Sequence, residues 1–198
     1  MKMARDIDGR WYEIEKLGDT KSENASFREA LPRYLNAFEI LFAAAAERSE
    51  FGFIECLLRV RGLQDAGWDP YETTLRAIDA LVKVHETIQE PEPARHLHLW
   101  IYGHIVEASE PYELLANLLD VANGGRFRVN RFPRVGGSAT RPGRPPSPAE
   151  KIDEIVAASR AVGLPQVAGP LNEIWDRELR NAVFSRRLFF PRRRIEAS

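Results

Sequence analysis

The sequence predicts an all-α fold: a single bundle of about seven helices with one long basic loop rich in Gly, Pro and Arg. Three observations support this prediction. Apolar residues recur at spacings of three and four, several segments carry residues that start or stop helices, and most connections are only a few residues long. Short connections between amphipathic helices favour antiparallel neighbours, as in a helical bundle. We place the single helical domain at residues 1–184 and its basic loop at residues 123–147.

The first predicted helices have loosely defined ends. We expect one helix at about residues 26–48, with Pro32 kinking or delaying it, and a second at about residues 51–66. Another is expected at about residues 94–108 and a last one at about residues 170–184. In each of these segments, apolar side chains repeat with the helical period.

A sharper start signal lies at residues 69–72, Asp-Pro-Tyr-Glu. Asp69 can accept hydrogen bonds as an N-cap, Pro70 stands where no intrahelical N–H is needed, and Glu72 can reach back to the cap. A helix should therefore begin at Asp69. Its predicted apolar face carries Leu75, Ile78, Val82 and His85.

The two remaining helices flank the basic loop. Pro111 opens the first, and Asn123-Gly124 supplies the left-handed cap that ends it. Ser147 and Glu150 form a predicted capping box at the start of the second, which Gly163 and a following proline should end. The loop between them is too long for a simple connector, and residues 126–129 alternate briefly, as in a short strand or hairpin.

Charge is divided unevenly along the chain. The net charge is −1, but residues 1–120 carry 13 basic and 22 acidic side chains, whereas residues 121–198 carry 15 basic and 7 acidic ones. No acid lies between Asp120 and Glu150. Four loop arginines are candidate RNA-binding residues because they can neutralise phosphates: Arg126, Arg128, Arg131 and Arg134. The alternative, which we favour on charge alone, is that these arginines dock on acids of the same protein.

Several functional classes lack support in the sequence. Cys56, the single cysteine, excludes an internal disulfide and a thiolate metal cluster within one chain. The four histidines show no metal-binding spacing, so no metal is expected. Gly124-Gly125 and Gly136-Gly137 lack the preceding strand and the following Lys-Ser/Thr of a phosphate-binding loop, and no other cofactor is expected. His104 and Glu107 lie three residues apart and can meet on a helix, although a structural role is the simpler interpretation. The N-terminal residues resemble no secretory signal and no apolar run spans a bilayer, which predicts a cytoplasmic protein.

The last predicted helix contains an Arg-Asn pair, Arg180 and Asn181. On a continuous helix Arg180 points away from the apolar face and Asn181 lies on its flank. The simplest explanation is an exposed ion pair between Asp176 and Arg180 at i, i+4, like that available to Glu173 and Arg177. Such a pair contributes roughly 0.2–0.5 kcal/mol on a solvated helix.

The segment Ile-Trp-Asp-Arg-Glu-Leu-Arg-Asn-Ala-Val-Phe, residues 174–184, resembles the late helix of HEPN-type (higher eukaryotes and prokaryotes nucleotide-binding) domains. These are small helical bundles, often dimeric, with Arg, a polar residue and a nearby His as their motif. In many members the Arg and His cut RNA without a metal, and others are partners of nucleotidyltransferases or non-catalytic binding modules. The resemblance makes Arg180 the candidate catalytic arginine and Asn181 its polar neighbour.

The motif histidine is missing from this chain. It should fall at residues 185–187, which are Ser185, Arg186 and Arg187. An arginine can stabilise the charge of a reacting phosphate, but at neutral pH it does not readily exchange the proton that metal-free cleavage requires. The resemblance therefore implies a relative of RNA-cleaving toxins or phage-defence proteins that is inactive as written. The partners it implies are RNA, a second copy of the chain, and a cognate antitoxin or nucleotidyltransferase.

The tail at residues 185–198 has no coherent pattern, with two phenylalanines among five arginines. If the arginines use CGN codons, reading one base later permits His at position 185. The tail is then the product of a frameshift in the gene or in its sequencing. The alternative is a natural basic tail, since blocks of like charge commonly form interaction segments. A non-enzymatic helical module that contacts RNA or an acidic protein is the competing functional interpretation.

Overall fold

The computed structural model describes residues 3–5, 11–13, 20–59, 70–138 and 141–184. Within these residues the fold is all-α, as the sequence predicts. The helices are α1 (Thr20–Arg48), α2 (Glu50–Arg59), α3 (Pro70–Thr87), α4 (Pro91–Glu107), α5 (Glu110–Ala122), α6 (Pro148–Ala161), α7 (Gly169–Ile174) and α8 (Arg177–Phe184), with a 3-10 turn, η3 (Pro165–Ala168), before α7. Two three-residue strands, β1 (Met3–Arg5) and β2 (Trp11–Glu13), pair antiparallel near the N-terminus.

The helix ends agree closely with the cap signals. The Ser147 side chain accepts from the Glu150 backbone N–H and the Glu150 carboxylate accepts from the Ser147 N–H, which confirms the capping box. Gly124 ends α5 with φ +82°, and Gly163 follows α6 with φ +75°. Both are left-handed positions that favour glycine. Asp69 lies outside the described residues, and α3 begins at Pro70.

Three helical predictions need correction. α1 begins at Thr20 and runs through Pro32, so this proline does not delay the helix. α4 begins at Pro91, earlier than predicted, because prolines at the first helical positions need no intrahelical N–H. The last predicted helix is two helices, since the chain is extended at Trp175, with ψ 115°.

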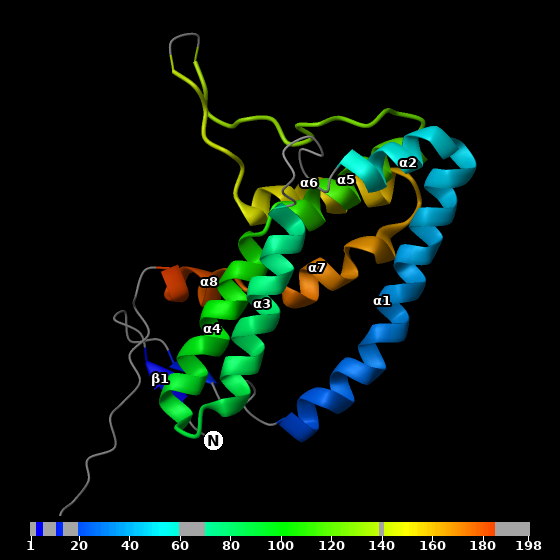
Figure 1. Cartoon of the computed structure of the whole chain (residues 1–198). Helices are drawn as coiled ribbons and strands as arrows, with labels where there is room; N and C mark the ends of the chain where they lie inside the picture. The colour runs from blue at the N-terminus through cyan, green and yellow to red at the C-terminus, as the bar shows by residue number, and fades with distance from the viewer. Residues whose placement is uncertain (1–2, 6–10, 14–19, 60–69, 139–140, 185–198) are drawn as a thin grey trace, which may run out of the picture.

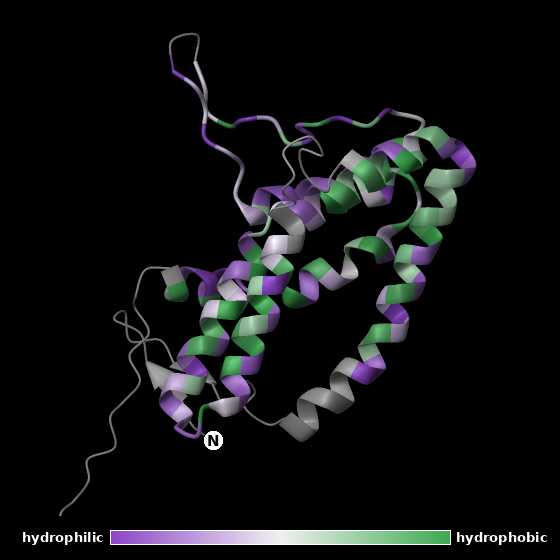
Figure 2. Ribbon diagram, viewed as in Figure 1, coloured by the Kyte–Doolittle hydropathy of each residue, from purple (hydrophilic) through white to green (hydrophobic). Residues whose placement is uncertain are grey.

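The core lies where α1, α2, α5, α6 and η3 pack together. In Figure 2 hydrophobic residues gather along the adjoining parts of α1, α2 and α5. The completely buried apolar side chains are Leu41, Ala45, Cys56, Ala116, Leu118, Leu119, Val121, Ile155 and Val167. Burial raises the pKa of the Cys56 thiol to about 11, so this thiol is a packing group that stays protonated at neutral pH.

α3 and α4 form a hairpin beside this core, and α8 packs on α4 (Figure 1). The predicted apolar face of α3 is only partly covered, because Ile78 is half-buried while Leu75 and Val82 remain exposed. No helix in the described part of the chain is both long and apolar enough to cross a membrane.

The basic loop between α5 and α6 contains no strand at residues 126–129. Isolated antiparallel bridges occur farther along, between Val135 and Arg144 and between Ser138 and Arg141. These bridges form a hairpin that extends away from the helices, as Figure 1 shows.

Candidate functional site

Arg180 lies on α8 and forms an ion pair with Glu107, the last residue of α4. Its Nε donates to Glu107 Oε1 at 2.5 Å, and its Nη2 contacts the same oxygen. The Arg180 side chain is 30% exposed and the Glu107 side chain 33% exposed. The pair is therefore partly shielded from water, which strengthens the attraction relative to a fully solvated pair.

Asn181 lies beside this ion pair. Its Oδ1 accepts a hydrogen bond from Arg180 Nη1 at 3.2 Å, and the residue is exposed. The structure thus brings both candidate catalytic residues together and adds Glu107 as a third member. Ser185, where the motif histidine is expected, lies outside the described residues.

The expected pairing of Arg180 with Asp176 is wrong. Because the helix is interrupted after α7, Asp176 stands at the N-cap of α8, and its Oδ1 accepts from the Leu179 backbone N–H at 2.8 Å. Glu173 likewise accepts from Arg33 and Tyr34 of α1 rather than pairing with Arg177.

Tyr102 of α4 holds the junction between α7 and α8. Its hydroxyl accepts from the Asp176 N–H at 2.9 Å and lies 3.2 Å from the carbonyl oxygens of Ile174 and Asp176. Burial raises the pKa of the Tyr102 phenol, so it remains a neutral donor and acceptor. The phenol fixes the direction of α8 relative to α4 and thereby the position of Arg180.

The histidines on α3 and α4 are arranged by ring packing. His104 is exposed and packs edge-on against Trp100, with ring centroids 4.4 Å apart, while Glu107 binds Arg180. His85 of α3 and His98 of α4 stack on one another, with ring centroids 3.6 Å apart. Within the described ranges, no group of three or more His, Cys, Asp and Glu side chains is arranged to hold a metal ion.

Most of the candidate RNA-binding arginines contact the protein itself. Arg128 Nη2 lies 2.5 Å from Asp120 Oδ2, and Arg131 Nε lies 2.6 Å from the same oxygen, in contact but without hydrogen-bond alignment. Arg131 also pairs with Glu154 at 3.0 Å. Arg134 donates to the Gly143 carbonyl at 2.6 Å. This is the alternative that the sequence favoured: arginines docked on the domain's own groups.

Arg126 differs from the other three. Its side chain is exposed and makes no hydrogen bond or ion pair with another residue in the described part of the chain. Arg134 likewise contacts no described carboxylate, but its guanidinium donates to a carbonyl, whereas Arg126 has neither kind of partner among the described residues.

Asn117 of α5 anchors the start of the loop. It is 1% exposed, its amide donates to the Glu113 and Arg128 carbonyls, and its Oδ1 accepts from the Arg128 N–H at 2.8 Å. Glu113 in turn accepts from the Arg131 N–H at 3.1 Å, and burial raises the pKa of Glu113. These contacts provide side-chain partners for backbone groups at the start of the loop.

Lys151 of α6 is a buried charge that the sequence pattern does not reveal. It is 7% exposed, donates to Ser109 Oγ at 2.8 Å, and lies over the rings of Tyr112 and Phe132. Burial lowers the pKa of Lys151, while nearby Glu113 raises it. The two aromatic faces and the serine hydroxyl offset part of the desolvation cost of the buried ammonium group.

Comparison of this chain with models of protein families, with curated proteins and with solved structures finds no match.

Proposed function

We propose that the chain is a HEPN-like helical domain that associates with RNA and lacks ribonuclease activity as written. The observation that carries this proposal is the arrangement of Arg180 and Asn181, which lie together on α8, where Glu107 from α4 orients the Arg180 guanidinium. An arginine that serves only as a solvated surface residue of a helix does not need a carboxylate partner from another helix. Orientation of an arginine by a carboxylate is a common way to fix a phosphate-binding group.

The absence of activity follows from the chemistry of the residues. Cleavage by a ribose 2′-hydroxyl requires a group that accepts and donates protons near neutral pH, and arginine does not. Arg180 is also already paired with Glu107, which offsets part of its charge toward a phosphate. In an intact relative, Arg180 would steady the scissile phosphate, Asn181 would orient the site, and a histidine at position 185 would move the proton.

The partners and setting in this proposal follow the same resemblance. We place the protein in the cytoplasm, as a relative of bacterial toxin–antitoxin or phage-defence proteins. A homodimer would pair two Arg180 sites, and a cognate antitoxin or nucleotidyltransferase would be its protein partner.

The test begins with the nucleotide sequence across codons 178–198. If the shifted frame encodes His at codon 185, the repaired chain should cut RNA in the presence of EDTA, and Arg180→Ala in that chain should abolish cleavage. The chain as written should not cut RNA. Failure of a repaired, folded chain to cut RNA would contradict the catalytic ancestry.

A second function is favoured by the loop. Arg128 and Arg131 bind Asp120, so the start of the loop is fixed against α5. A fixed basic loop can serve as a binding surface, and the alternative function is a non-enzymatic module that contacts RNA or an acidic protein. If the shifted frame does not permit the histidine, this alternative becomes the better explanation. RNA binding that weakens steeply with salt and is unchanged in Arg180→Ala would support it.

A further inference from the structure

A small pocket lies where α5 ends and the basic loop begins. Its lining consists of Asp120, Asn123, Gly124, Gly125, Arg126 and Arg128. Two backbone hydrogen bonds shape it, from the Gly124 N–H to the Val121 carbonyl at 2.9 Å and from the Gly125 N–H to the Asp120 carbonyl at 2.8 Å. This is the Schellman geometry that closes a helix C-terminus.

The glycine pair leaves part of the pocket wall as bare backbone. Gly124 has φ +82°, which L side chains rarely adopt. A Cβ on Gly125 would lie 2.9 Å from the Asp120 carbonyl oxygen, closer than real Cβ contacts. The turn therefore favours glycine at both positions, because the Cβ direction of Gly125 is filled by the Asp120 carbonyl and that of Gly124 by the Arg48 guanidinium.

Arg48, the last residue of α1, lies against the same turn. A Cβ on Gly124 would be 2.8 Å from Arg48 Nη2 and 3.1 Å from its Nε, so the edge of the guanidinium that carries these two nitrogens lies against the glycine. Arg48 is exposed, and within the described residues its side chain makes neither a hydrogen bond nor an ion pair. The sequence offered no signal for this arginine, because it lies 76 residues before Gly124.

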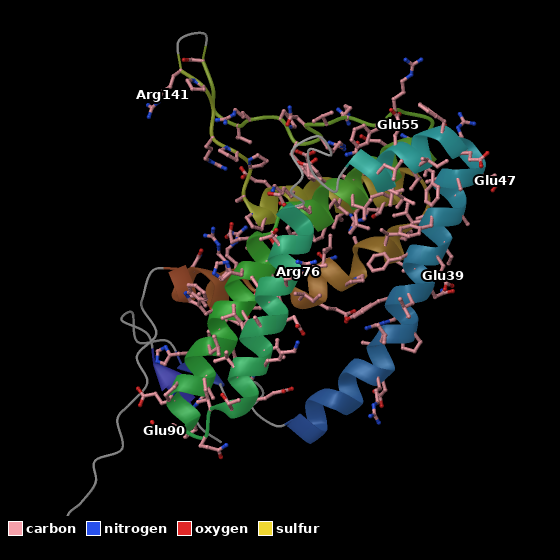
Figure 3. All side chains as sticks on the ribbon, viewed as in Figure 1. Glu39, Glu47, Glu55, Arg76, Glu90 and Arg141 are labelled. Atoms are coloured by element: carbon pink, nitrogen blue, oxygen red, sulfur yellow. The ribbon has the colours of Figure 1, made fainter. Side chains whose placement is uncertain are left out.

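The charges around the pocket leave a positive excess. Asp120 is the carboxylate in the lining, and both Arg128 and Arg131 contact it. Arg131 is further balanced by Glu154. Glu55 on α2 (labelled in Figure 3) is a further carboxylate near this region, since with Asp120 it raises the pKa of Cys56, after the larger effect of burial. Arg48 and Arg126 add two guanidinium groups to these charges, and no carboxylate among the described residues contacts either guanidinium.

We propose that this pocket binds one phosphate group, with Arg126 and Arg48 as its charged donors and Gly124-Gly125 as part of its wall. A phosphate carries enough charge for two guanidinium groups and offers several acceptor oxygens for their planar forks. The group can come from an RNA backbone or from free phosphate. We favour an RNA backbone as the source of the phosphate, and this choice of source rests on the proposed function. The recognition of a phosphate group rests on the pocket alone.

The experiment uses the full chain and two probes, a fluorescein-labelled oligouridylate and inorganic phosphate. Arg48→Gln and Arg126→Gln should each weaken oligouridylate binding about five- to tenfold and together reduce the salt slope by about two. Arg141→Gln is the matched control, since it removes the same charge from an exposed residue on the hairpin of the basic loop (Figure 3). It should change the affinity less than about twofold. Arg48→Lys and Arg126→Lys, which retain charge, should recover only part of the binding.

Inorganic phosphate is titrated while the amide resonances of Gly124 and Gly125 are followed by NMR. Shifts that vanish in Arg48→Gln and Arg126→Gln support the site. If phosphate gives these shifts but the oligouridylate does not bind, the phosphate site stands, its source is free phosphate, and the proposed association with RNA fails. Equal weakening by Arg141→Gln, equal competition by polyglutamate, or no response to either probe would overturn the proposal.

Discussion

Glu107 and Arg180 lie 73 residues apart in the sequence and form an ion pair that joins the end of α4 to α8. Both side chains are about two-thirds shielded from water. The pair therefore resembles neither a surface ion pair, which contributes little, nor a fully buried one, whose desolvation offsets most of its attraction. With the hydrogen bonds of Tyr102 at the start of α8, it positions the candidate catalytic arginine relative to α4.

A double-mutant cycle measures this contact. We expect Glu107→Gln and Arg180→Ala each to lower the free energy of unfolding, with a coupling energy of about 1 kcal/mol between them. The measurement is urea unfolding of the four proteins. Arg177→Ala is the control for removing an α8 arginine, because its side chain is exposed. A coupling energy below about 0.3 kcal/mol would show that the pair does not hold α8 on α4.

Removal of Asn117 should loosen the start of the basic loop. Asn117→Ala removes two partly buried hydrogen bonds to the Arg128 N–H and carbonyl, and each such bond contributes roughly 0.5–1.5 kcal/mol. We expect a loss of about 2 kcal/mol in the free energy of unfolding and faster hydrogen exchange at Arg128. The control is Asn36→Ala on exposed α1 surface, which should change stability by less than about 0.5 kcal/mol. Unchanged exchange at Arg128 in Asn117→Ala would count against the anchoring role.

Glu150 should make stability depend on acid pH. Arg144 and Ser147 donate hydrogen bonds to its carboxylate and lower its pKa to about 2. Because the unfolded value is about 4.3, the folded chain gains stability above that pH and loses it as the pH falls through about 2. We expect the Tm to fall between these pH values, and to fall less in Glu150→Gln. The pH profile of Asp153→Asn, an exposed acid on the same helix, is the comparison. Superimposable profiles for Glu150→Gln and the parent chain would show that Glu150 does not contribute.

The features that the sequence predicts well are local ones. The caps at Ser147, Gly124 and Gly163 depend on neighbours within a few residues, so the motif contains the information that fixes the structure. The break before α8 depends instead on Tyr102, more than 70 residues away, which holds the backbone of Asp176. The sequence therefore predicts one continuous helix where the fold has two, α7 and α8.

The candidate site shows the same division. Arg180 and Asn181 are recognisable as a pair because they are adjacent, but the sequence relates Glu107 only to His104, three residues before it. The sequence predicts that the loop arginines dock on the domain, because the loop is basic and the rest of the chain is acidic. The carboxylate that each arginine reaches is set by the packing of α5 against α6. Contacts between distant elements have no signature in a single sequence.

Gly124 and Gly163 offer a matched test of the turn that Arg48 covers. Both have left-handed φ values, so replacing either with alanine should cost roughly 1 kcal/mol of unfolding free energy. Their surroundings differ, because a Cβ on Gly163 meets nothing within 4 Å whereas a Cβ on Gly124 meets the Arg48 guanidinium. That guanidinium is the end of a flexible exposed side chain and can move aside at little cost, so the two losses should agree within about 0.5 kcal/mol. Only Gly124→Ala should shift the Arg48 Nε–H resonance. An unmoved resonance in a folded Gly124→Ala chain would mean that Arg48 does not lie over this turn in solution.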